Sequence, residues 1–147
     1  MKSRNKLNVI ALIISLIGMT DSAYLAVIKL TNNRNLCLPG LGDCWTVNNS
    51  QYSEIFGIPL SFFGFVAYLS IFLLLTLEIK STFWLKYSVI FTFVFSLSGV
   101  IISIYLTYLQ FFVIKALCPF CLFSACTMTT LFVISLIRFI NYQPEQI

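Results

Sequence analysis

Four long stretches of this sequence carry almost no charge, and each is long enough to cross a lipid bilayer. They run over about residues 7–30, 56–77, 83–112 and 118–139. A helix needs roughly 20 apolar residues to span the hydrocarbon core, and only helices or closed barrels satisfy all their backbone hydrogen bonds there. The pattern predicts an all-α integral membrane protein, a four-helix bundle formed by a single domain over residues 1–147.

The overall composition agrees with this prediction. With 59% hydrophobic and 10% charged residues, the chain is too apolar for an ordinary soluble domain. Its net charge of +4 is small and no basic patch with interleaved aromatic residues occurs, so we expect no nucleic-acid partner. The first apolar stretch follows basic residues, as in a signal peptide, but it continues to Ile28, which is too long for a cleaved segment. We therefore expect it to be retained as a span.

The basic residues predict how the chain lies across the membrane, because cytoplasmic loops carry an excess of lysine and arginine. In a four-span arrangement, six basic residues fall on one side and three on the other. The six are Lys2, Arg4, Lys6, Lys80, Lys86 and Arg138, and the three are Lys29, Arg34 and Lys115. We expect a multi-pass cell-membrane protein with both termini in the cytoplasm and the loop over residues 31–55 outside. Asp21, inside the first span, is expected near the outer headgroups with a polar partner rather than in a proton relay.

Cys118-Pro119-Phe120-Cys121 opens the fourth apolar stretch and is the strongest chemical signal in the chain. Two intervening residues let both sulfurs share one face of the first turn of a helix, where a disulfide can form and break. A helix N-terminus carries partial positive charge and unpaired N–H groups, so we expect it to lower the pKa of a cysteine placed there. Proline suits the same turn, since its missing N–H costs nothing there. The motif predicts a redox-active dithiol at a membrane surface.

Other roles compete for the cysteines. A Cys-x-x-Cys is half of a zinc site, but zinc needs two more ligands, the chain has no histidine, and Cys37 and Cys44 lack the spacing of a zinc knuckle. Cys126, deeper in the fourth stretch, suits the role of a small hydrophobic residue. Cys37 and Cys44 could instead form a static brace, in which case the chain would be a structural or assembly protein of the membrane.

Two cysteine pairs on one oxidising side of the membrane favour a relay. Thiols and disulfides exchange electrons when a thiolate attacks a disulfide and forms a mixed disulfide. The loop pair, Cys37 and Cys44, suits a protein partner, whereas Cys118 and Cys121, fixed beside the lipid, suit a lipid-soluble two-electron acceptor such as a quinone. Phe111, close to this pair in sequence, is a candidate for the wall of a quinone pocket. No metal or flavin is expected, because histidine and a glycine-rich fingerprint are both absent.

Several motifs together resemble the bacterial homologues of vitamin K epoxide reductase. The resemblance covers about residues 15 to 138. It lies in the spacing of Cys37, Cys44 and Ser50, in Asp21-Ser22-Ala23-Tyr24-Leu25, in Phe56-Gly57-Ile58-Pro59-Leu60-Ser61, and in Ser103-Ile104-Tyr105-Leu106-Thr107-Tyr108 running into Ala116-Leu117-Cys118-Pro119-Phe120-Cys121. The combination is specific, whereas Cys-x-x-Cys alone is not.

This resemblance implies a four-helix bundle around a quinone, which is menaquinone or ubiquinone. It also implies that the protein receives electrons from a thioredoxin-fold (DsbA-like) protein, passes them to the quinone and so supports disulfide formation in exported proteins. It implies that Cys121 faces the quinone, that Cys118 exchanges with the loop pair, and that Ser50 lies near the quinone head group. Of the loop pair, we favour Cys37 for the protein partner and Cys44 for exchange with the dithiol.

Two departures from the family bear on the expected role. Many bacterial members carry a fused thioredoxin-like domain, whereas this sequence stops at Ile147, so we expect the partner in trans. The longer insertion before the second span of the vertebrate enzymes is also absent. Reduction of vitamin K quinone or its epoxide is therefore expected only in principle, and we do not assign it as the physiological role. The nearest rival class, the DsbB-type quinone-linked oxidases, has its two cysteine pairs in the reverse order.

Overall fold

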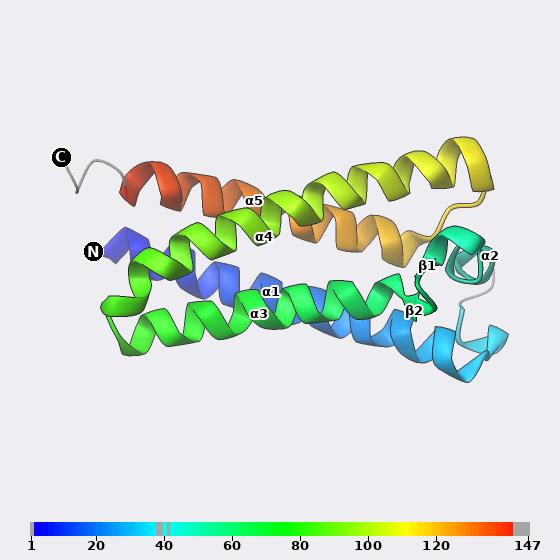
Figure 1. Cartoon of the computed structure of the whole chain (residues 1–147), viewed down its shortest axis with the longest axis horizontal. Coiled ribbons are helices and arrows are strands. Elements are labelled where there is room, and N and C mark those ends of the chain that lie inside the picture. The colour runs from blue at the N-terminus through cyan, green and yellow to red at the C-terminus, as the bar shows by residue number, and fades with distance from the viewer. Residues whose placement is uncertain (1, 38–39, 41, 143–147) are drawn as a thin grey trace.

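Four long helices lie side by side in the computed structural model, which describes residues 2–37, 40 and 42–142. They are α1 (Lys2–Thr31), α3 (Leu60–Lys80), α4 (Phe83–Tyr108) and α5 (Pro119–Tyr142). The start of α1 and the end of α5 lie at one end of the bundle, and the short helix α2 (Cys44–Asn48) lies at the other (Figure 1). The predicted four-helix bundle is confirmed.

Each long helix is apolar enough to cross a membrane. The candidate spans are Asn5–Thr31, Leu60–Lys80, Phe83–Ile114 and Pro119–Tyr142. Many large hydrophobic side chains point outward from the bundle, for example Leu73 at 50% and Ile104 at 66% exposed. An apolar surface of this extent is unusual for a soluble protein, and it is what a helix facing lipid presents.

Tyr68 of α3 lies at the centre of the bundle and is 1% exposed. Its ring packs directly over Gly18 of α1, where an added Cβ would come within 2.3 Å of the ring. Its hydroxyl donates a hydrogen bond to the Ser124 carbonyl of α5 at 3.0 Å. Small residues let membrane helices approach closely, so Gly18 determines how three helices meet around this ring. The same core contains Ala11, Ile71, Leu75, Met128, Leu131 and Ile134.

A buried polar cluster joins all four helices near the end where α1 begins. Glu78 of α3 accepts hydrogen bonds from Asn8 of α1 (2.8 Å) and Ser88 of α4 (2.9 Å), and it forms an ion pair with Arg138 of α5. The side chains of Arg138 and Glu78 are only 3% and 4% exposed. The sequence alone counts Arg138 among the basic residues of one membrane side, and the structure adds that the Glu78 carboxylate holds its guanidinium inside the bundle.

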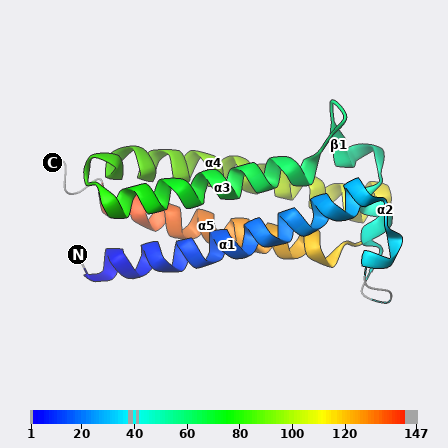
Figure 2. The same ribbon diagram turned by 90° about the horizontal axis from the view of Figure 1, so that it is seen from below.

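The second membrane helix begins later than predicted, at Leu60 instead of residue 56. The preceding residues form a small antiparallel hairpin of β1 (Glu54–Ile55) and β2 (Ile58–Pro59), in which Ile55 pairs with Ile58. Phe56 and Gly57 form the turn with φ of 53° and 78°, the positive values that a two-residue hairpin turn of type I′ requires. The hairpin projects from the bundle (Figure 2), and an apolar run alone does not distinguish it from the start of a helix.

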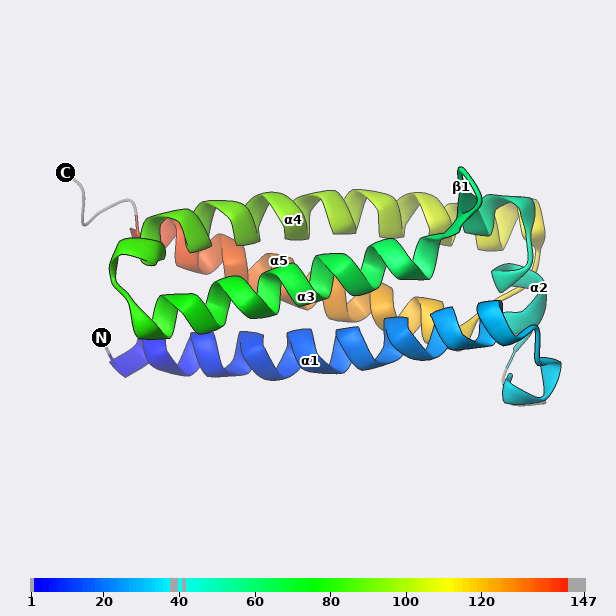
Figure 3. The ribbon, with the colours of Figure 1, turned by 60° about the horizontal axis from the view of Figure 1, so that its bottom comes forward.

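The third helical stretch is the longest, as predicted. α4 continues directly into a π-helical segment, Leu109–Ile114, and the whole stretch covers 32 residues. It ends at Lys115, whose φ of 54° is in the left-handed region. The chain then turns back into α5 at the end of the bundle that carries α2 (Figure 3).

Candidate functional site

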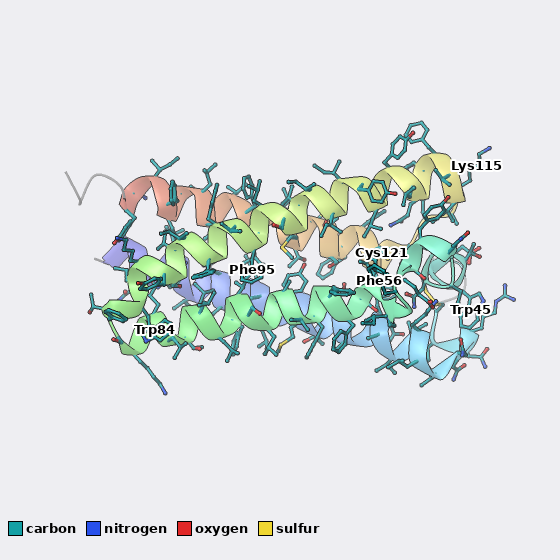
Figure 4. The ribbon with its side chains drawn as sticks, viewed as in Figure 1. Trp45, Phe56, Trp84, Phe95, Lys115 and Cys121 are labelled. Atoms are coloured by element: carbon teal, nitrogen blue, oxygen red, sulfur yellow. A yellow bond between two sulfur atoms is a disulfide. The ribbon has the colours of Figure 1, made fainter. Side chains whose placement is uncertain are left out.

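Four cysteines meet at the end of the bundle that carries α2. Cys37 and Cys44 form a disulfide, and Cys44 is the first residue of α2. Cys118 directly precedes α5, and Cys121 lies in its first turn; both are free thiols. Figure 4 shows Cys121 at the same end of the bundle as Trp45 of α2. The structure brings together the four cysteines selected from the sequence.

Cys44 and Cys118 belong to the same buried cluster. They are 2% and 0% exposed and pack in it with Leu25 and Ile28 of α1. Cys37 and Cys121 are partly buried and pack against the cluster, so the loop pair and the helix pair share one set of apolar neighbours.

The loop approaches the Cys-x-x-Cys motif closely because Gly42 has no side chain. A Cβ at Gly42 would come within 2.5 Å of the Leu117 carbonyl oxygen, and its φ of +108° is also rare for other residues. The next residue, Asp43, donates its backbone N–H to the same carbonyl at 2.9 Å. Asp43 also caps α2 by accepting hydrogen bonds from Thr46, and these bonds lower the pKa of the Asp43 carboxyl below its ordinary 3.8. One short segment therefore caps α2 and fastens the disulfide loop to the residue before Cys118.

The surroundings of Cys118 favour its thiolate. The hydrogen bond with the Cys121 thiol lowers the pKa of the Cys118 thiol below its ordinary 9.0, burial opposes this, and the backbone N–H groups of Cys121 and Phe120 lower the pKa further. The Cys121 N–H lies 3.4 Å from the Cys118 Sγ. These donors are free N–H groups of the first turn of α5; they act in the direction expected of a helix N-terminus, but the Cys121 thiol has the larger effect on the pKa of Cys118.

A cavity of about 280 Å³ opens between the four helices beneath the α2 loop, and its lining is mainly apolar. Cys121 lies in its wall, together with Ser50, Tyr52 and Ser53 of the loop and with Gln110 at the start of the π-helical segment. Ligand pockets have this character, an apolar wall with few polar groups. The shape and the chemistry suit an apolar ring that carries hydrogen-bond acceptors, and the Cys121 thiol lies beside it.

Two residues selected for a quinone pocket have different positions. Ser50 lines the cavity, and its hydroxyl donates to the Val47 carbonyl at 2.8 Å. Phe111 is not among the cavity-lining residues and its side chain is 52% exposed. The structure therefore brings Ser50 to the cavity and does not bring Phe111 there.

Lys29, near the end of α1, holds the loop that covers the cavity. Its ammonium group donates hydrogen bonds to the Asn48 carbonyl (2.9 Å) and the Ser53 hydroxyl (3.2 Å), and it forms an ion pair with Glu54 (2.8 Å). The Asn48 side chain also donates to the Leu25 carbonyl of α1 at 3.1 Å. From the sequence, Lys29 is only one of the basic residues on the outer side, and its place in the last turn before a polar loop was the one available signal of this role.

Two further expectations concern the first and fourth helices. Asp21 is 9% exposed, and its Oδ2 has no hydrogen-bond partner among the residues that the structure describes. The expected polar partner at the headgroups is therefore not found for this oxygen. Cys126 is a free, exposed thiol on the outer face of α5, in an apolar setting.

Comparison with known proteins agrees with this architecture. A family model described as "Vitamin K epoxide reductase family" matches residues 9–136. A relative in Arabidopsis thaliana, thiol-disulfide oxidoreductase LTO1, is 46% identical over 50 residues, which make up 34% of this chain and 13% of that protein. The shared stretch is thus a small part of the plant protein, whereas the family model spans most of the present sequence with its four membrane helices. The chain belongs to the vitamin K epoxide reductase family and is a multi-pass membrane protein.

Proposed function

We propose that this protein is a quinone-dependent thiol oxidoreductase of the membrane, which passes electrons from a thioredoxin-fold partner to a quinone. One observation carries the proposal: Cys118 packs with Cys44 of the loop disulfide, while Cys121 lies in the wall of the apolar cavity. A single dithiol therefore contacts both the loop pair and a space that suits a lipid-soluble ligand. Family membership supports the quinone, and the name of the plant relative supports thiol–disulfide exchange.

The electrons enter through the loop pair. A thiolate of the reduced partner attacks Cys37, the S–S bond to Cys44 breaks, and the second partner thiol then releases the oxidised partner. The Cys44 thiolate attacks Cys118 of the Cys118–Cys121 disulfide, and Cys121 leaves as a thiolate. Attack by Cys37 on the mixed disulfide re-forms the loop disulfide and leaves two electrons on Cys118 and Cys121. The Cys37–Cys44 disulfide and the free Cys118 and Cys121 thiols correspond to this distribution of electrons, and Cys121 lies beside the cavity.

The electrons leave through the cavity. Cys118 and Cys121 together give two electrons and two protons to menaquinone or ubiquinone, their disulfide re-forms, and a quinol departs. The lowered pKa of Cys118 supplies the thiolate that this exchange needs. Ser50 lies in the cavity wall and would donate to a quinone carbonyl if its hydroxyl turned from Val47. In a membrane with the cysteines outside and both termini in the cytoplasm, the net result is disulfide formation in exported proteins.

Quinone reduction by purified protein tests this function. The protein in detergent is mixed anaerobically with a soluble ubiquinone analogue and a reduced thioredoxin-fold dithiol protein, and quinone absorbance is followed. We expect turnover that Cys121→Ala abolishes and Cys126→Ala leaves unchanged, since Cys126 is an exposed thiol that is absent from the cavity lining. Full turnover by Cys121→Ala would contradict the proposal.

A second variant separates a relay from a static brace. In Cys37→Ala/Cys44→Ala, turnover with the protein dithiol should be lost, while turnover with dithiothreitol, a small reductant that reduces Cys118–Cys121 directly, should remain. If the protein dithiol still supported turnover in this variant, the loop disulfide would be a brace and not an electron carrier.

A further inference from the structure

Gln110 connects the redox-active cysteines to the cavity, and neither the motifs nor the proposed relay uses it. It is 3% exposed and lies in the π-helical segment Leu109–Ile114. Its Oε1 accepts a hydrogen bond from the Cys118 backbone N–H at 3.1 Å. Short π-helical turns within α-helices occur frequently at functional sites, and here the turn lies opposite the start of α5.

The hydrogen bond fixes the orientation of the Gln110 amide. A backbone N–H pairs only with the oxygen of a side-chain amide, so the NH₂ group of Gln110 lies on the other branch. This Nε2 has no hydrogen-bond partner among the residues that the structure describes, and Gln110 lines the same cavity as Cys121. Gln110 thus has an occupied oxygen and two N–H donors for which the described part of the chain provides no acceptor.

The missing acceptor has a defined chemistry. The Gln110 Nε2 is not among the fully buried atoms that lack a partner, so it keeps accessible surface at the cavity wall, and a ligand carbonyl in the cavity would give its N–H groups an acceptor. The Cys118 N–H polarises the amide through its oxygen, which strengthens the N–H groups as donors. A quinone carbonyl gains negative charge as it is reduced, and a fixed donor stabilises that charge best.

We propose that Gln110 donates a hydrogen bond to a carbonyl of the bound quinone while its oxygen holds the backbone of Cys118. This inference rests on the proposed quinone reduction and adds a specific residue to it. One amide then sets both the position of the quinone ring and the position of the dithiol that reduces it.

Equilibrium binding tests the proposal without depending on turnover. A soluble ubiquinone analogue is titrated into the detergent-solubilised protein, and quenching of the fluorescence of Trp45 and Trp84 reports the Kd. Gln110→Met keeps the length of the side chain and removes both hydrogen bonds, so we expect the Kd to rise about tenfold, which corresponds to about 1.4 kcal/mol. Gln51→Met is the matched control, because Gln51 is exposed and is absent from the cavity lining, and its Kd should equal that of the wild type.

Gln110→Glu separates ligand binding from a purely structural role. A glutamic acid still accepts the Cys118 N–H, but it donates to the quinone only while protonated. We expect binding near the wild-type level at acidic pH and a rise in Kd as the carboxyl ionises, while the wild-type Kd stays constant over the same range. Unchanged binding by Gln110→Met, or a pH-independent Kd for Gln110→Glu, would overturn the proposal. Tight, Gln110-dependent binding without quinone turnover would refute the proposed function and leave this inference standing.

Discussion

Removing one charge of the buried Glu78–Arg138 pair should destabilise the bundle much more than removing both. Glu78→Gln leaves the Arg138 guanidinium, 3% exposed and with an Nε that has no hydrogen-bond partner among the described residues, without a counter-charge. Breaking a buried ion pair from one side costs about 3–5 kcal/mol. We expect a loss of this size in the free energy of unfolding for Glu78→Gln. For Arg138→Met we expect a loss of about 3 kcal/mol, because the Glu78 carboxylate left behind keeps its hydrogen bonds from Asn8 and Ser88.

The double variant Glu78→Gln/Arg138→Met should recover most of the loss. The introduced amide oxygen still accepts from Asn8, its NH₂ group can donate to the Ser88 hydroxyl, and an uncharged chain fills the volume of the arginine. Replacing a buried pair by neutral groups is often close to neutral, so we expect a total cost of about 1–2 kcal/mol and a coupling energy of about 3 kcal/mol or more between the two positions.

Titration from dodecyl maltoside into sodium dodecyl sulfate, followed by circular dichroism, measures these free energies. Lys80→Gln is the control, because Lys80 is an exposed charge on the same helix, and its stability should change by less than about 0.5 kcal/mol. Single variants that each cost under about 1 kcal/mol, or a double variant that costs the sum of both singles, would refute the reasoning that burial makes this pair interdependent.

Three further predictions concern the site and the core. The pKa of the Asp43 carboxyl is lowered in the folded loop, so its cap of α2 stabilises the loop above pH 3.8, and this stabilisation is lost as the pH falls through the lowered pKa. Asp43→Ala should lower the free energy of unfolding by about 1 kcal/mol at neutral pH and should make no further difference in acid, as measured by unfolding titrations. In the reduced protein, the lowered pKa of Cys118 should give thiolate absorbance at 240 nm below the pH range of an ordinary thiol, a readout that needs no reagent to reach this buried sulfur. Cys121→Ala removes the largest cause of the lowered pKa and should shift the Cys118 titration to higher pH; an unshifted titration would contradict this. Gly18→Ala would press a methyl group into the Tyr68 ring, so the free energy of unfolding should fall by about 1–3 kcal/mol, and a change within about 0.5 kcal/mol would show that the helices separate easily.

The sequence predicts the four spans well because the thickness of the bilayer sets the length of an uninterrupted apolar helix. The hairpin at Glu54–Pro59 could not be predicted in this way, because Ile55, Phe56 and Ile58 extend the apolar run and hydrophobicity does not indicate where the backbone turns. Gly57 was the one local signal of a turn. The ion pair of Arg138 also could not be predicted from the sequence, because its partner Glu78 is 60 residues away and only helix packing brings the two together.

Some residues of the candidate site could likewise be predicted from the sequence, and others could be identified only from the fold. The spacing of Cys118 and Cys121 and their place before an apolar stretch have a chemical meaning that the sequence carries by itself. Gln110 and Lys29 are ordinary polar residues in sequence, and they became functional candidates only when the fold showed which backbone groups they bind. Phe111 was selected by its closeness in sequence, but the direction of its side chain depends on the rotation of the π-helical segment, which sequence spacing does not define.

The contacts of Lys29 give the two halves of the outer loop different freedom to move. Residues 48–54 are fastened to α1 at three points by one ammonium group. The half that carries the disulfide is joined to the rest of the protein through the Asp43–Leu117 backbone bond and a hydrogen bond from Tyr24 to the Leu36 carbonyl. Cys44 of this half is packed in the buried cluster with Cys118, so in the proposed relay opening of the disulfide frees Cys37, while Cys44 and residues 48–54 stay in place. In the proposed relay, thiol exchange with a partner protein and quinone reduction in the cavity would then take place on opposite sides of residues 48–54.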